Sequence, residues 1–124
     1  MLEFLLRIET RDEHFSPTPV GGRGPDDFES QFDQQPIEIA AIADACARAW
    51  TITSNPRWIA EIARAWKWFL GENDVGVPMF NPDTGGGFDG LHAHGPNQNQ
   101  GAESTMAMLS TAQQFYRYCS SPTT

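Results

Sequence analysis

The hydrophobic residues of this chain recur at helical spacing in one short and three longer segments. In the short segment the leucines share one face, which predicts a short helix within residues 1–12. Proline is well tolerated in the first turn of a helix, so Pro36 and Pro56 mark two of the longer helix starts. Together with the hydrophobic periodicity, they predict helices at 36–53, 56–70 and 102–118.

The three longer segments differ in how much of their surface is apolar. Residues 37–50 are apolar nearly all round, which is typical of a helix enclosed by other helices. The segment 56–70 carries one polar stripe opposite an aromatic face, as expected of a surface helix. Small residues such as Ser104 and Ala107 would let the last helix approach a neighbour closely. The alternation predicts an all-α fold of about four helices arranged as helical hairpins.

Two long segments, 13–35 and 71–101, lack this periodicity and are rich in glycine, proline, asparagine and aspartate. Such composition predicts loops. Loops of this length are uncommon in a small domain and are often functional. Residues 1–124 as a whole are expected to form a single α-hairpin domain.

The composition narrows the class of partner. The formal net charge is −8, and Lys67 is the sole lysine among scattered arginines. Nucleic-acid and membrane partners are therefore not expected, whereas a neutral ligand such as a carbohydrate suits the charge.

The compartment is predicted from what the sequence lacks. No segment approaches the length of a membrane span, and the first residues do not resemble a signal peptide. The two cysteines, Cys46 and Cys119, are too few for a disulfide framework and are expected to be buried free thiols. A cytoplasmic location is predicted.

The pattern Gln-x-x-Glu occurs at two expected helix starts, at residues 35–38 and 100–103. One complete helix separates them, which suggests two parallel helices that begin at the same end of the molecule. Such helix starts gather unpaired N–H groups and a partial positive charge. Glu38 and Glu103 then have two interpretations. Each caps its own helix by bonding back to the cap residue, the favoured role, or the two carboxylates act together on a glycosidic bond.

Several runs of residues resemble a bacterial protein family. The runs are Phe-Asp-Gln-Gln-Pro-Ile-Glu at 32–38, Trp-Phe-Leu-Gly-Glu-Asn-Asp at 68–74, Gly-Gly-Gly-Phe-Asp-Gly-Leu at 85–91, and Asn-Gln-Asn-Gln-Gly-Ala-Glu-Ser-Thr at 97–105. They are similar to the C-terminal part of the α/α-toroid (six-hairpin glycosidase-like) domain associated with bacterial group 1 glycosyltransferases. A complete toroid has many more helices than this chain, so the resemblance implies an incomplete arc of that ring.

The resemblance and the two helix starts select the candidate site. The candidate catalytic residues are Glu38, Glu103, Asp89 and His92. Side chains suited to bind sugar hydroxyls are the candidate substrate-binding residues, namely Asp33, Gln34, Asn97, Asn99 and Gln100. Turn formation accounts for the Asp89-Gly90 pair equally well, and the amides would equally serve to brace the loop.

No metal or other cofactor is expected. A three-ligand site at Asp89, His92 and His94 does not have a zinc spacing. The glycine run 85–87 has neither the lysine nor the preceding strand of a nucleotide-binding loop.

These features predict a non-catalytic or vestigial module that binds a glycan or sugar, or serves assembly. It would derive from the glycosyltransferase-associated domain. The alternative is one part of a carbohydrate-active enzyme that uses paired carboxylates. An open arc of hairpins leaves apolar flanks uncovered, so a homo-oligomer is also expected.

Overall fold

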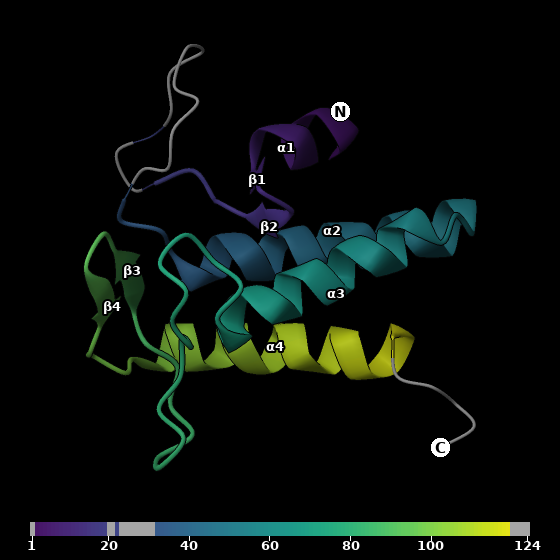
Figure 1. Ribbon diagram of the computed structural model, residues 1–124. Coiled ribbons are helices and arrows are strands. Elements are labelled where there is room, and N and C mark those ends of the chain that lie inside the picture. Colours follow the sequence, from purple (N-terminus) through teal and green to yellow (C-terminus); the bar gives the residue numbers. More distant parts are fainter. Residues whose placement is uncertain (1, 20–21, 23–31, 120–124) are drawn as a thin grey trace.

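The protein consists of a bundle of three long helices with smaller elements on one side and at one end (Figure 1). The computed structural model describes residues 2–19, 22 and 32–119. Within this part of the chain the elements are α1 (Leu2–Ile8), β1 (Thr10–Arg11), β2 (His14–Phe15), α2 (Pro36–Thr53), α3 (Arg57–Leu70), β3 (Gly90–His92), β4 (Gly95–Asn97) and α4 (Ala102–Tyr118).

Helices α2 and α4 run parallel, and α3 runs antiparallel to both (Figure 1). Each of the three packs against the other two. The Gln114 side-chain amide on α4 donates a 3.0 Å hydrogen bond to the Asp44 carboxylate on α2. This bond joins the two parallel helices, so the Gln-x-x-Glu starts lie at a common end, as the sequence suggested.

The turn between α2 and α3 is set by local hydrogen bonds. Ser54 has a left-handed φ of 57° and its N–H bonds to the Trp50 carbonyl, which ends α2. Just before Pro56, the cap residue of α3, the Asn55 side chain accepts a 3.0 Å bond from the Arg57 N–H and forms a local turn. The indole N–H of Trp58 donates to the Thr53 hydroxyl at 3.1 Å and ties the two helices across the turn.

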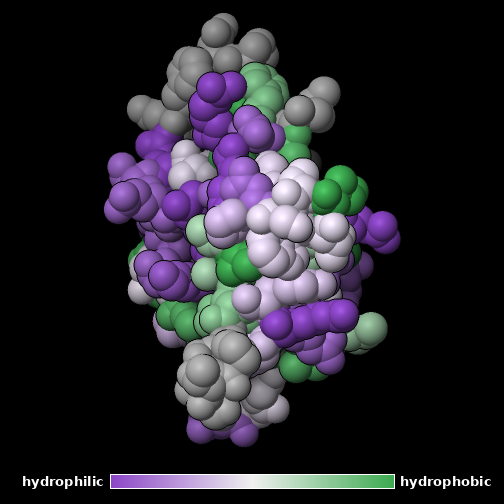
Figure 2. Space-filling view, turned by 90° about the vertical axis from the view of Figure 1, so that its right-hand side faces the viewer, coloured by the Kyte–Doolittle hydropathy of each residue, from purple (hydrophilic) through white to green (hydrophobic). Residues whose placement is uncertain are grey.

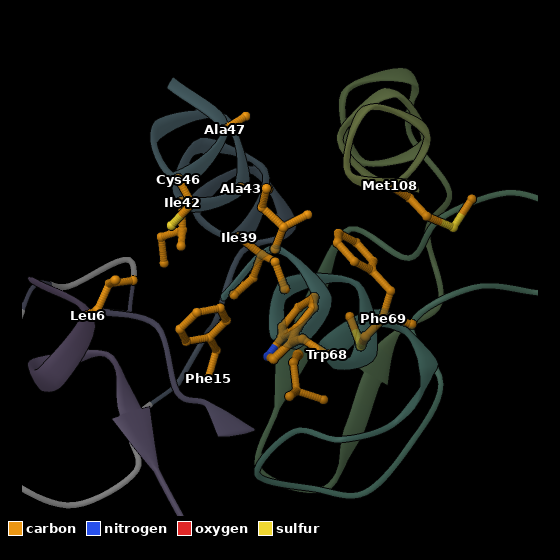
Figure 3. Close-up of a cluster of buried hydrophobic side chains, with 14 of the residues drawn as sticks. Leu6, Phe15, Ile39, Ile42, Ala43, Cys46, Ala47, Trp68, Phe69 and Met108 are labelled. Carbon is orange, nitrogen blue, oxygen red and sulfur yellow. The ribbon is translucent and has the colours of Figure 1, made fainter. Parts of the chain in front are cut away.

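The hydrophobic core lies between the helices and reaches out to β2 (Figure 3). Phe15 from β2, Ile39 from α2 and Trp68 from α3 are completely buried in it. Figure 3 shows these side chains gathered between the two strands near the N-terminus and α4. The apolar all-round surface expected for residues 37–50 is therefore largely covered within the chain.

The two cysteines are free thiols with different exposure. Cys46 is buried, and this burial raises the pKa of its thiol to about 12, with a further rise from the nearby Glu61 carboxylate. Cys119 is half-buried, its thiol donates to the Ile59 carbonyl at 3.4 Å, and burial raises its pKa. Because the thiolate is the reactive form, both thiols are poor nucleophiles near neutral pH.

The expectation of an all-α fold is wrong. The chain is mostly helical, but β1 pairs with β2 and β3 pairs with β4 in two small antiparallel sheets. In the first hairpin the turn residues Asp12 and Glu13 both have positive φ, at 51° and 68°. Hairpin turns of this kind usually contain glycine or asparagine, so the sequence carries no hairpin signal there.

Strand β1 lies within residues 1–12, where only a short helix was expected, and the other three strands lie in the segments expected to be loops. The second hairpin, β3–β4, lies within 71–101 and has Leu91 opposite Pro96. Strands of two or three residues are too short to show the alternation from which a strand is recognised in a sequence. None of the helices in the described ranges is long and apolar enough to cross a membrane.

The loop before β3 packs tightly on α4, which gives a test of the fold. A Cβ on Gly87 would lie 2.9 Å from the Ser104 backbone oxygen, whereas one on Gly90 would meet only the Gln34 carbonyl at 3.5 Å. We expect Gly87→Ala to lower the free energy of unfolding by about 1–3 kcal/mol, since backbone must shift. The matched control Gly90→Ala should change it by less than about 1 kcal/mol, measured by urea denaturation. Equal losses would show that the loop does not pack in this way.

Candidate functional site

The candidate site lies at the end of the bundle where α2 and α4 begin, next to the β3–β4 hairpin (Figure 1). An isolated antiparallel bridge joins the segment before α2 to β3. In this bridge the Gln34 N–H donates to the Leu91 carbonyl at 2.9 Å, and the Leu91 N–H donates to the Gln34 carbonyl at 2.8 Å. Residues on either side of such a bridge face each other, which brings Asp33 and His92 together.

The Asp33 carboxylate is in hydrogen-bond contact with Nδ1 of His92. Both side chains are 43% exposed, so the pair is open to solvent and to a ligand. A carboxylate that holds one ring nitrogen fixes the orientation of the imidazole and leaves the other nitrogen for an external partner. The pair therefore presents one prearranged hydrogen-bonding group at the surface.

A buried polar network lies directly behind this pair. Gln34 is completely buried, and its side-chain amide donates to the Asp74 carboxylate at 2.7 Å. The same carboxylate accepts a 2.5 Å bond from the Ser16 hydroxyl and lies 2.7 Å from Nε2 of His14. Because Asp74 is only 3% exposed at its side chain, these contacts are needed to compensate the burial of its charge. The network anchors Gln34, and hence the bridge that carries Asp33.

Sequence reasoning did not select His14, Ser16 or Asp74. Asp74 is part of the run 68–74 that resembles the toroid family, but the resemblance implies no role for it. His14 and Ser16 lie in the segment 13–35, which was expected to be a loop. The available signal was a set of polar residues next to aromatic and proline residues, which is too general to identify a buried network.

Glu38 and Glu103 lie on the first turns of α2 and α4, at the same end of the bundle (Figure 1). Both are exposed, and neither carboxylate has a hydrogen bond or ion pair within the described part of the chain. Neither cap residue, Gln35 or Gly101, bonds to its helix through a side chain. The capping interpretation is therefore wrong for both glutamates. Their local effect is the favourable one of a negative charge near a helix N-terminus.

Three of the other predicted site residues hold the loop together. The Asp89 carboxylate accepts a 2.7 Å bond from the N–H of Gly101, the cap residue of α4. The Thr84 hydroxyl donates to the Gln100 side chain at 2.5 Å. The Asn97 side chain accepts a 3.0 Å bond from the Asn99 N–H. Bracing is thus the role that the contacts show for Asp89, Asn97 and Gln100, while Asn99 is exposed beside them.

The candidate residues are accessible to solvent, since Asp33 and His92 are 43% exposed and Glu38 and Glu103 are also exposed. One groove, of about 460 Å³, lies between α1 and α3, and another, of about 380 Å³, lies between the C-terminal halves of α2 and α4. Neither groove is lined by a candidate residue. In the described ranges, no three histidine, cysteine, aspartate or glutamate side chains converge as metal ligands, so the alternative at Asp89, His92 and His94 has no support.

Comparison with known proteins adds no family to this picture. No protein-family model matches the chain, and no curated protein is similar to it. The resemblance to the toroid family therefore stays a prediction, and any function has to be argued from the contacts described above.

The buried network gives a test of how the site is held. We expect Asp74→Asn to lower the free energy of unfolding by about 2–4 kcal/mol, because an amide cannot accept from all the buried donors. Ser16→Ala removes one donor and leaves the carboxylate its other partners, so it should cost only about 1 kcal/mol. Both values are measurable by urea denaturation. If Asp74→Asn cost no more than Ser16→Ala, the carboxylate would not be the centre of the network.

Proposed function

We propose that this protein binds a carbohydrate, without turning it over, at the end of the bundle where α2 and α4 begin. The observation that carries the proposal is the half-exposed Asp33–His92 pair, held in place from behind by the buried residues Gln34 and Asp74. Carboxylates and an oriented imidazole are suitable partners for the hydroxyl groups of a sugar. Glu38 and Glu103 add two further acceptors at the same end that no described residue occupies.

The charge of this end favours a neutral sugar. Residues 32–47 and 68–116, which build the site, contain no lysine or arginine. An acidic sugar would meet only repulsion from Asp33, Glu38 and Glu103. Neutral hydroxyl groups, in contrast, can donate to all three carboxylates.

Binding without catalysis is favoured by the solvent exposure of the candidate residues. Enzymes that act on glycosidic bonds hold the reacting bond between two carboxyl groups at a defined separation. Here the Asp33 and His92 side chains are each 43% exposed and open to solvent. The alternative is a glycoside-processing enzyme that uses Glu38 and Glu103. It is supported by the position of these two residues at the same end of the bundle.

The binding proposal predicts a loss of affinity when the pair is broken. A glycan array with the full chain identifies the ligand, and calorimetry then measures Kd. We expect Asp33→Asn and His92→Gln each to weaken binding by about tenfold or more, because each removes a hydrogen bond to a charged or oriented group. The control is Asp83→Asn, which removes an exposed carboxylate from a turn outside the candidate site.

The outcomes separate the two functions. An array on which no glycan binds would contradict the binding proposal. Hydrolysis of a bound glycan that stops in Glu38→Gln and Glu103→Gln, with unchanged melting temperature, would replace it with the enzyme alternative. A large loss of stability in these variants is not expected, since neither carboxylate has a partner in the described chain.

Self-association is a second proposal, carried by the exposed face of α4. Met106, Leu109 and Tyr116 lie close to one stripe of this helix and are 67%, 52% and 61% exposed. Gln113 lies between them, so the stripe carries no charge in a chain whose net charge is −8. An apolar, uncharged stripe on a surface helix is typical of a face that packs against another protein. We propose that it packs against the same stripe of a second copy.

A charge placed in this stripe should dissociate the assembly. We expect the unaltered protein to be a dimer or larger oligomer by light scattering, and Leu109→Glu to be a monomer with retained helix content. The control Ala60→Glu places the same charge at an exposed position of α3 and should leave the assembly intact. A monomeric unaltered protein at high micromolar concentration would refute the proposal.

A further inference from the structure

A groove of about 380 Å³ runs between the C-terminal halves of α2 and α4, at the opposite end of the bundle from the candidate sugar site. Its walls come from Ala47, Arg48 and Thr51 on α2 and from Gln114, Arg117 and Tyr118 on α4, with Asp44 at its inner end. Figure 2 views the molecule from this end, where hydrophilic and intermediate side chains predominate and hydrophobic ones lie in separate small areas. Apart from Ala47 and the ring of Tyr118, the side chains that line the groove are polar or charged, so an apolar occupant would not suit it.

The two arginines of this groove have no acidic partner in the described part of the chain. In the groove between α1 and α3, by contrast, Arg57 pairs with Glu3 at 3.1 Å and Arg64 pairs with Glu61 at 3.2 Å. Arg7 and Arg11 also form no ion pair in the described residues, so Arg48 and Arg117 are distinguished by lining one and the same groove. The lack of a neighbouring carboxylate at Arg48 and Arg117 follows from the sequence, because residues 45–60 and 104–119 contain no aspartate or glutamate.

Stabilisation of helix ends explains only one of these two side chains. Arg117 lies in the last turn of α4, where a positive charge interacts favourably with the helix dipole. Arg48 does not lie in the last turn of α2, which has no basic residue there. A purely structural role therefore leaves Arg48 unexplained.

The remaining polar groups line the same groove as the two arginines. The Gln114 amide holds the Asp44 carboxylate at 3.0 Å, which fixes both side chains and leaves the groove with two positive charges against one negative. The guanidinium carbon of Arg117 lies 5.4 Å from the centre of the Tyr118 ring, which restrains that side chain. Thr51 adds a hydroxyl, although it also donates to the Arg48 carbonyl at 2.8 Å.

We propose that this groove binds the phosphate monoester of a small polar molecule such as a sugar phosphate. Guanidinium groups match the oxygens of phosphate in geometry, and two of them from opposite walls suit its double charge. The carboxylate and amide of Asp44 and Gln114 are placed to bind hydroxyl groups of the same molecule. The volume lies within the range of small-molecule sites. This inference does not depend on the carbohydrate site at the other end.

The test is a titration of the full chain, labelled with ¹⁵N, with glucose 6-phosphate at low ionic strength. We expect saturable shifts of the resonances of Arg48, Thr51 and Arg117. Arg48→Gln and Arg117→Gln should each weaken binding by about tenfold or more. The control Arg7→Gln removes an arginine from the other groove and should leave binding unchanged. All three variants are at exposed positions, and thermal melts verify that they fold.

Three further ligands define the chemistry. Glucose alone should not bind this groove, inorganic phosphate should bind it more weakly than glucose 6-phosphate, and glucose 6-sulfate should bind more weakly because it carries one charge. Equal binding of the sulfate would overturn the assignment to a phosphate monoester. Absence of shifts at these residues with millimolar glucose 6-phosphate, or loss of binding in Arg7→Gln alone, would overturn the site itself.

Discussion

The candidate site depends on one short contact between distant parts of the chain, the two-bond bridge between Gln34 and Leu91. It joins the residues that lead into α2 to the hairpin that precedes α4. Leu91 and Gln34 are both completely buried, so water does not compete for these bonds. Without the bridge nothing in the helices alone would bring Asp33 to His92.

The bridge is supported by the buried carboxylate of Asp74, and removing a charge from water costs free energy. Asp74 takes hydrogen bonds from Ser16 and Gln34 and a contact with His14, so it joins its own segment to two others, 14–16 and the residues before α2. A carboxylate so deeply placed loses its hydration, and only several good donors offset that loss. The hydrogen bonds of the carboxylate are directional and define how these segments meet. An apolar residue at the same place would pack without defining that arrangement.

The parallel arrangement of α2 and α4 makes the two ends of the bundle chemically different. Acidic side chains cluster where both helices begin, and Arg48 and Arg117 lie toward the ends at which both helices finish. For most of these charges the sign agrees with that of the helix dipole nearby, so the pattern stabilises the helices while it separates the charges. One end thus suits hydroxyl groups and the other suits an anion, and Arg48 is the side chain that the dipole does not explain.

The sequence by itself determined the long helices and their direction. Hydrophobic periodicity predicted them, and Pro36 and Pro56 marked two of their starts, because these signals act over a few neighbouring residues. The choice of Asp33 and His92 as site residues also came from the sequence. The tertiary structure alone decided that these two side chains pair, that Glu38 and Glu103 make no capping bond, and that Asp89 accepts a bond from the cap residue of α4. It also added the two hairpins and the network of His14, Ser16 and Asp74. Strands of two or three residues and contacts between residues about sixty positions apart leave no local pattern, since their energy comes from partners that only the folded chain brings near.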